Sequence, residues 1–327
     1  MRKSRFALAV LAVTAGFVGV TGTAAQAHDH SGPSPTTASP VNPSGGVVFL
    51  AAELSGRNEV PVPGGPAVGD PDGRAVEVLR IQGNQVSFGV AWRNLGALTA
   101  SHVHEGAAGL NGPVKVPFFG TALPANLNGA TGKVTVADTA LLDSLRANPE
   151  KFYANLHTTE FPGGAVRGQL RKLKNGVDLV RFLDFGPLVS ILSGDQEVPV
   201  PGGPAVGDPD GHATGFLAAY GSRVDFTFTW FGIAPPTLGH IHQGKVGVNG
   251  PVVVPLFAAA GGLPASLTGI SGTATGVSKD LVRSIRSHPR DFYTNLHNAE
   301  LPGGAVRGQI FRPGRTSTWR DMISWKA

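Results

Sequence analysis

The chain repeats itself, and this repeat constrains its fold more than any other feature of the sequence. The stretch Leu54–Gly73 returns 138 residues later as Leu192–Gly211, with changes only at Arg57 and Asn58. Near-identity over such a length indicates duplication of a structural unit. We therefore expect two copies of one domain, in residues 47–172 and 187–312, joined by a linker in residues 173–186 and followed by a tail in residues 313–327.

Apolar and polar residues alternate in the stretches between the glycines and prolines, as in residues 85–92 and 224–230. A period of two predicts half-buried strands, about eight in each copy. Asp138 can cap a helix over residues 139–147, and Ser278 can cap one over residues 279–287. Short strands without strand–helix alternation predict an all-β fold, in which two tandem Greek-key-like antiparallel β-sandwiches each carry one short helix.

The N-terminal region is predicted to direct export. Residues 1–27 hold three basic residues, an apolar run and a closing Ala-Gln-Ala, which is the layout of a signal peptide; an uncleaved anchor is the alternative. Residues 28–46 are rich in serine, threonine and proline and predict a disordered leader. We expect a secreted or extracytoplasmic protein whose mature form has no membrane span.

Charge and cysteine content exclude several classes of protein. Removal of the signal peptide lowers the lysine and arginine total from 27 to 24, against 22 acidic residues, so that the net charge falls to +2. The sequence has no basic cluster with interleaved aromatic residues, so it does not predict nucleic-acid binding. Because the chain has no cysteine, disulfides and cysteine-ligated zinc are excluded.

Histidines are the residues that offer chemistry. Each copy has a His-x-His pair, and a strand places both imidazoles of such a pair on one face. A third histidine follows about fifty residues later. Three neutral imidazoles with an open coordination position suit zinc or copper(II). We predict one metal site per copy, formed by His102, His104 and His157 and by His240, His242 and His297.

Two further polar stripes accompany these histidines, Tyr-x-Asn on the strand of the third histidine and Arg-x-Gln on the last strand. We expect them to orient the imidazole rings from a second shell. They are Tyr153, Asn155, Arg167 and Gln169, matched by Tyr293, Asn295, Arg307 and Gln309. The alternative is that the stripes are solvent faces of ordinary strands, or that the histidines hydrogen-bond the glycine-rich loops.

The repeated acidic residues suggest turns and loop anchors. Asp-Pro-Asp-Gly at residues 70–73 and 208–211 is typical of a turn, with a calcium site as the alternative. Glu59 and Glu197 are expected to hold the proline-rich loop. Motifs of common hydrolases and kinases are absent, so no catalytic residue is predicted.

The expected signal cleavage would also create a metal chelate at the new N-terminus. Cleavage after Ala27 exposes His28-Asp29-His30, whose amine, backbone amides and third-residue imidazole favour copper(II) or nickel(II). The site formed by His28 and His30 depends on that cleavage.

Four motifs occur in order and twice: Leu-Ser-Gly-x-x-Glu-Val-Pro, His-x-His-x-Gly-x-x-Gly-x-Asn-Gly-Pro-Val, Phe-Tyr-x-Asn-Leu-His and Pro-Gly-Gly-Ala-Val-Arg-Gly-Gln. Together they resemble the CHRD domain, the module named after chordin. The resemblance covers nearly all of residues 47–172 and 187–312. It implies an extracellular binding module, because the family is associated in animals with proteins that antagonise growth factors.

A local resemblance points to a different class. His102-Val103-His104-Glu105 with a following glycine is similar to the copper-ligand strand of copper/zinc superoxide dismutase, itself a Greek-key sandwich. The bridging histidine, the zinc-binding set and the cysteine pair of that enzyme have no counterpart in either copy.

Three functions therefore remain open. The first is an exported module that binds an unknown extracellular protein or surface partner and holds one transition-metal ion per copy. The second is a copper-dependent oxidoreductase, and the third is a metal-free structural or adhesive surface protein.

Overall fold

The computed structural model describes residues 46–179, 183 and 186–314. The expected signal peptide, the His28 and His30 chelate, and the tail from residue 315 onward lie outside them. In the described part of the chain, no helix has the length and apolar character needed to cross a membrane.

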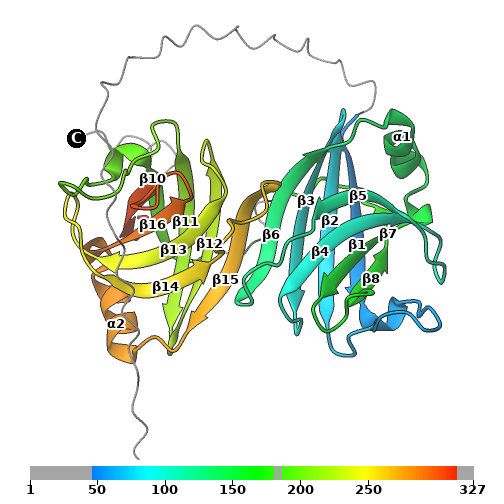
Figure 1. Cartoon of the computed structure of the whole chain (residues 1–327), viewed down its shortest axis with the longest axis horizontal. Helices are drawn as coiled ribbons and strands as arrows, with labels where there is room; N and C mark the ends of the chain where they lie inside the picture. Colours follow the sequence, from blue (N-terminus) through cyan, green and yellow to red (C-terminus); the bar gives the residue numbers. More distant parts are fainter. Residues whose placement is uncertain (1–45, 180–182, 184–185, 315–327) are drawn as a thin grey trace, which may run out of the picture. The chain divides into compact units, whose positions relative to one another are not determined.

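The first repeat consists of short strands and one α-helix (Figure 1). Its strands are β1 (Val48–Ser55), β2 (Arg74–Gln82), β3 (Gln85–Arg93), β4 (Leu98–Glu105), β5 (Val114–Phe119), β6 (Leu127–Thr135), β7 (Phe152–Thr158), β8 (Val166–Gln169) and β9 (Arg171–Lys172). Helix α1 (Thr139–Ala147) lies between β6 and β7, and the 3-10 turns η1 (Gly56–Asn58) and η2 (Pro149–Lys151) follow β1 and α1.

The second repeat has the same order of elements, with the single strand β17 in place of β8 and β9. Its strands are β10 (Leu188–Ser193), β11 (His212–Tyr220), β12 (Arg223–Phe231), β13 (Pro236–Gln243), β14 (Val252–Ala258), β15 (Leu267–Thr275), β16 (Phe292–Asn298) and β17 (Val306–Phe311). Helix α2 (Lys279–Ser287) matches α1, and η4 (Gly194–Gln196) and η5 (Pro289–Asp291) match the 3-10 turns.

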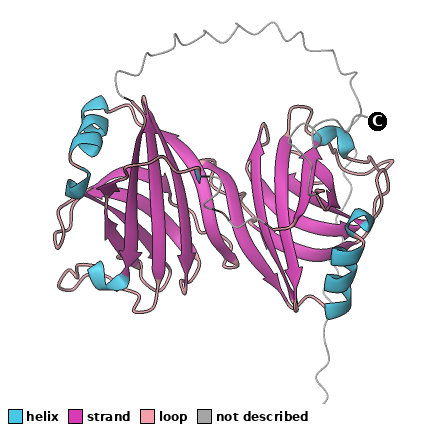
Figure 2. Ribbon diagram, turned by 180° about the vertical axis from the view of Figure 1, so that it is seen from behind, coloured by secondary structure: helices cyan, strands magenta, loops and turns pink. Residues whose placement is uncertain are grey.

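Each repeat is an antiparallel sheet with Greek-key connections. In the first repeat the hydrogen-bonded order is β5-β4-β7-β8-β1-β2-β3-β6, and the second repeat has the corresponding order from β14 to β15. The pairing of β3 with β6 and of β4 with β7 skips the strands between them in sequence, as a Greek key requires. The all-β prediction is confirmed, and Figure 2 shows that helices are short and peripheral.

Local sequence signals account for both helices. The Asp138 side chain accepts a hydrogen bond from the backbone N–H of Leu141, and Ser278 caps α2 in the same way at Leu281. These caps satisfy a backbone donor that the first turn leaves free. Each helix ends before a proline, at Pro149 and Pro289, which cannot continue it.

The core lies inside each folded sheet, on the face where every second side chain is apolar. It includes Leu79, Phe88 and Val103 in the first repeat, all with no solvent exposure. Strand β6 of the first repeat also pairs with β15 of the second, with Ala130 opposite Ile270. The two sheets are thereby joined by backbone hydrogen bonds as well as by the linker.

Candidate functional site

The pairing of β4 with β7 brings the three predicted histidines of the first repeat together. His102 and His104 point outward from β4, since Val103 between them is buried in the core. The register places His102 opposite Asn155 and Ala100 opposite His157. A residue about fifty positions away in sequence therefore lies one strand away in space.

The same arrangement occurs in the second repeat through β13 and β16. In both clusters each histidine offers one ring nitrogen, and these nitrogens all lie within 4.8 Å of one another. In the first repeat, His102 Nδ1 lies 3.4 Å from His157 Nε2. In the second repeat, His240 Nδ1 lies 3.2 Å from His297 Nε2. Small ring movements would bring the nitrogens to the roughly 3.3 Å separation that bonds of about 2 Å in a tetrahedral centre imply.

Backbone carbonyls fix the orientation of two imidazoles in each cluster. His104 Nδ1 donates to the carbonyl oxygen of Gly112 at 2.9 Å, and His157 Nδ1 donates to that of Pro162 at 3.0 Å. Because a carbonyl only accepts, the proton lies on Nδ1 and Nε2 keeps its lone pair, which in His157 faces His102 Nδ1. The Nε2 atom of His104 is buried and has no hydrogen-bond partner in the described structure. Metal-binding histidines commonly show this pattern.

The second repeat reproduces these contacts. His242 Nδ1 donates to the Gly250 carbonyl at 2.9 Å, and His297 Nδ1 donates to that of Pro302 at 3.0 Å. The Nε2 atom of His242 is likewise buried without a partner among the described residues.

The imidazoles are held in the neutral form that binds metals. Burial, together with the nearby His157 and His104, lowers the pKa of His102 to about 4. Burial also lowers the pKa of His104 and of His157, against the raising effect of their carbonyl partners. The shifts therefore favour uncharged imidazoles at neutral pH, the form in which histidine binds metals.

A stack of three side chains supports His104. Its ring lies parallel to that of Tyr153, with centroids 4.8 Å apart, and the Arg167 guanidinium covers the other face of the tyrosine at 3.4 Å. Arg167 also donates to Asn111 Oδ1 at 3.0 Å and to the carbonyl of Leu110 at 2.7 Å. It therefore fixes the loop whose Gly112 carbonyl holds His104.

The other residues that were expected to orient the imidazole rings bind a loop carbonyl or a carboxylate. Gln169 donates to the carbonyls of Gly106 and Glu150 and, within the described residues, has no hydrogen bond to an imidazole. Asn155 donates to Glu59 Oε2 at 3.4 Å. The matching set Tyr293, Asn295, Arg307 and Gln309 makes the same contacts in the second repeat.

Glu59 lies beneath the loop that follows β7. Gly164 in that loop has a φ of +139°, and a Cβ there would lie 2.7 Å from either carboxylate oxygen of Glu59. Burial raises the pKa of Glu59 to about 7, although Arg167 and the Asn155 hydrogen bond lower it. The carboxylate therefore contacts the loop after β7 and Asn155, and the expectation that Glu59 holds the proline-rich loop stays a prediction.

The Asp-Pro-Asp-Gly segment at residues 70–73 forms a turn that is held by the Asp70 side chain. Asp70 Oδ1 accepts from the backbone N–H groups of Asp72 and Gly73, at 3.2 and 2.8 Å. These bonds already use the Oδ1 atom for the turn itself.

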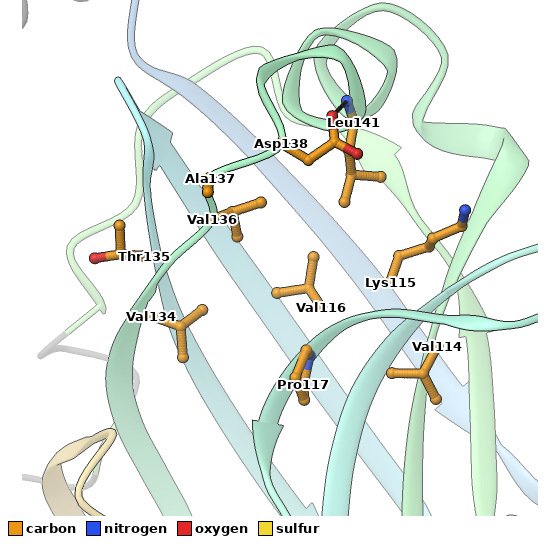
Figure 3. A pocket seen from close by; sticks show the side chains of 10 residues that line it. All are labelled: Val114, Lys115, Val116, Pro117, Val134, Thr135, Val136, Ala137, Asp138 and Leu141. Carbon is orange, nitrogen blue, oxygen red and sulfur yellow. Dashed lines mark hydrogen bonds between the residues drawn. The ribbon is translucent and has the colours of Figure 1, made fainter.

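A separate hollow of about 350 Å³ lies between β5, the end of β6 and the start of α1 (Figure 3). Its lining is mostly aliphatic, including Val116 and Val136. Asp138 is engaged in capping α1, and Lys115 forms an ion pair with Glu105 at 2.9 Å. Its two charged side chains are therefore already committed to structural contacts.

His104 and His157 hydrogen-bond the glycine-rich loops, as one of the alternatives expected, but the sequence did not identify Gly112 and Pro162 as the residues whose carbonyls accept. Their signal is the Asn-Gly-Pro after the histidine pair and the Pro-Gly-Gly after the third histidine. Both motifs suggest turns, and nothing in their composition shows that a carbonyl of the turn faces an imidazole.

An all-β tandem repeat with one three-histidine cluster on the outer face of each sheet defines the class of this protein. The CHRD domain description matches residues 50–170 and 188–310, so the chain belongs to the CHRD domain family as a tandem binding module. The predicted two-copy resemblance is confirmed. No curated protein matches the chain.

Proposed function

We propose that the protein is an exported binding module for an extracellular protein or surface, and that each repeat holds one copper(II) or zinc ion. The supporting observation is the convergence of three histidine nitrogens within 4.8 Å in both repeats. The ligands would be His102, His104 and His157, and His240, His242 and His297.

The donor set favours these metals over others. Neither cluster includes a carboxylate within the same distance, among the residues that the structure describes. Magnesium and calcium prefer oxygen ligands, whereas imidazole nitrogens suit copper(II) and zinc. Three protein ligands leave a further coordination position for water or for a donor from a bound partner.

The test is elemental analysis of protein purified without a histidine tag, followed by calorimetric titration with copper(II) and zinc. We expect two ions per chain at the clusters, and loss of both in the double variant His104→Ala and His242→Ala. His288→Asn is the matched control, because His288 is exposed and Asn148 stands at the equivalent position of the first repeat. All variants should carry His30→Ala, which removes the expected terminal chelate.

Equal metal uptake by the double variant and the control would refute the proposal. Absence of uptake by the folded parent would instead support a metal-free structural or adhesive protein. Catalytic turnover of superoxide or peroxide by the copper-loaded protein would support the oxidoreductase alternative.

A further inference from the structure

The first repeat carries a basic hollow on the outer surface of β1, β2, β8 and β9. The hollow has a volume of about 490 Å³ and is lined by Arg57, Arg74 and Arg171, with Glu53 as its one acidic residue. Three positive charges face one negative charge, so the hollow attracts anions.

The three guanidinium groups make few hydrogen bonds or ion pairs with the described residues. Arg57 is exposed and has neither a hydrogen bond nor an ion pair within the described structure. Arg74 uses one nitrogen, Nη1, to donate to the carbonyls of Pro71 and Gly73. Arg171 lies 3.5 Å from Glu53, but both side chains are more than two-thirds exposed, so this pair is weak.

A buried hydroxyl group lines the same hollow without a partner. Ser55 is 7% exposed, and its Oγ atom makes no hydrogen bond to any described residue. A buried polar group left in this state is unfavourable, and such groups are uncommon in folded proteins.

In the second repeat, the serine at the position of Ser55 has the hydrogen-bond partners that the Ser55 hydroxyl lacks. Ser193, the equivalent of Ser55, donates to the Asp195 carboxylate and accepts from Gln196 Nε2 at 2.9 Å. Asp195 and Gln196 occupy the positions of Arg57 and Asn58, the two changes within the otherwise identical stretch. The second repeat thus supplies its own carboxylate where the first supplies an arginine.

The other charged residues that line the hollow are also replaced in the second repeat. The equivalents of Arg74 and Arg171 are His212 and Phe311, and the equivalent of Glu53 is Ile191. The three arginines are therefore specific to the first repeat.

We propose that this hollow binds an oxyanion group of a ligand, a carboxylate, sulfate or phosphate. One oxygen accepts from the Ser55 hydroxyl, as the Asp195 carboxylate accepts from Ser193. The guanidinium groups of Arg57, Arg74 and Arg171 donate to the other oxygens, and Arg suits such planar pairing. The site is independent of the histidine clusters.

The test is amide NMR of the full chain titrated separately with acetate, inorganic sulfate and inorganic phosphate. Saturable shifts are expected at residues 53–58, and the anion that binds most tightly identifies the ligand chemistry. A triple variant carries Arg57→Asp, Arg74→His and Arg171→Phe, the residues of the second repeat. It should bind at least tenfold more weakly, with unchanged signals from residues 187–312.

Two single variants distinguish specific binding in the hollow from general electrostatic attraction of anions to a positive surface. Ser55→Ala leaves the net charge unchanged and should weaken binding at least threefold. Arg80→Ala removes a charge outside the hollow, introduces the residue that the second repeat has as Ala218, and should leave the affinity within twofold of the parent. The proposal is overturned if no anion shifts residues 53–58, if the triple variant binds like the parent, or if Ser55→Ala binds like the parent.

Discussion

Replacement of Glu77 by glutamine is expected to stabilise the protein at neutral pH. Glu77 has no solvent exposure and points into the core of the first repeat. Its Oε2 atom lies 3.4 Å from the Ser101 hydroxyl, and its Oε1 atom has no partner within the described structure. Burial raises the pKa of this carboxyl to about 8, against the lowering effect of Ser101.

The magnitude follows from the difference between the folded and unfolded pKa values. Below pH 4.5 the carboxyl is protonated in both states, and folding costs nothing extra. Between pH 4.5 and about 8 the unfolded chain releases a proton that the folded chain retains, so the free energy of unfolding falls as pH rises. At about 1.4 kcal/mol per pH unit, the loss at pH 7 is roughly 3 kcal/mol.

The assay is urea unfolding of the parent and Glu77→Gln proteins between pH 4 and 8. The variant's advantage should be smallest at pH 4 and should grow by about 1.4 kcal/mol per pH unit above 4.5. Glu53→Gln is the control, because the Glu53 side chain lies on the adjacent strand and is 80% exposed. A Glu77→Gln advantage that does not change between pH 5 and 7 would show that the carboxyl is not held protonated.

Three further predictions concern the histidine centre and its supports. Gly164→Ala should destabilise the fold by about 1–3 kcal/mol in urea unfolding, because alanine avoids a φ of +139° and its Cβ would meet the Glu59 carboxylate. Arg167→Lys should cost about 2–4 kcal/mol and speed hydrogen exchange in the loop after β4, since lysine lacks the fork that bonds this loop. Zinc at a hundredfold excess over its dissociation constant should stabilise each repeat by about 2.7 kcal/mol, and this gain should vanish in His104→Ala with His242→Ala.

Local signals were sufficient to predict the elements of this fold. Helices α1 and α2 begin after Asp138 and Ser278 and end before a proline, as the capping rules require. The period of two correctly identified His102 and His104 as residues of one strand face. These features depend on neighbours within a few residues, so a single sequence reveals them.

Features that depend on long-range contacts were not predictable. Glu77 looks like a solvent-facing residue between two valines, yet Val76 is 40% exposed and Glu77 is buried. Tyr153 and Asn155 looked like members of an exposed polar stripe, but they are 2% and 4% exposed. Loops from distant parts of the chain cover them, and no local pattern specifies which face a loop will cover.

Comparison of the two repeats shows that buried polar groups could be rearranged elsewhere in the core. The first repeat buries Glu77 beside Ser101, whereas the second has Gly215 and Gly239 at these positions. The second repeat instead pairs Thr294 with the Ser190 hydroxyl at 2.7 Å. The cores of the two repeats therefore contain different buried polar residues at different positions.

The histidine centres were not rearranged in this way, although they carry a similar energetic cost. Ten buried side-chain atoms lack a hydrogen-bond partner in the described structure, and six of them form three pairs at equivalent positions of the two repeats. They are His104 Nε2 with His242 Nε2, Asn155 Oδ1 with Asn295 Oδ1, and Glu59 Oε1 with Glu197 Oε1. An unsatisfied buried acceptor costs about 1–3 kcal/mol, and a substitution could remove it, as happened in the core. A metal ion that binds the Nε2 lone pair would remove this cost at His104 and at His242.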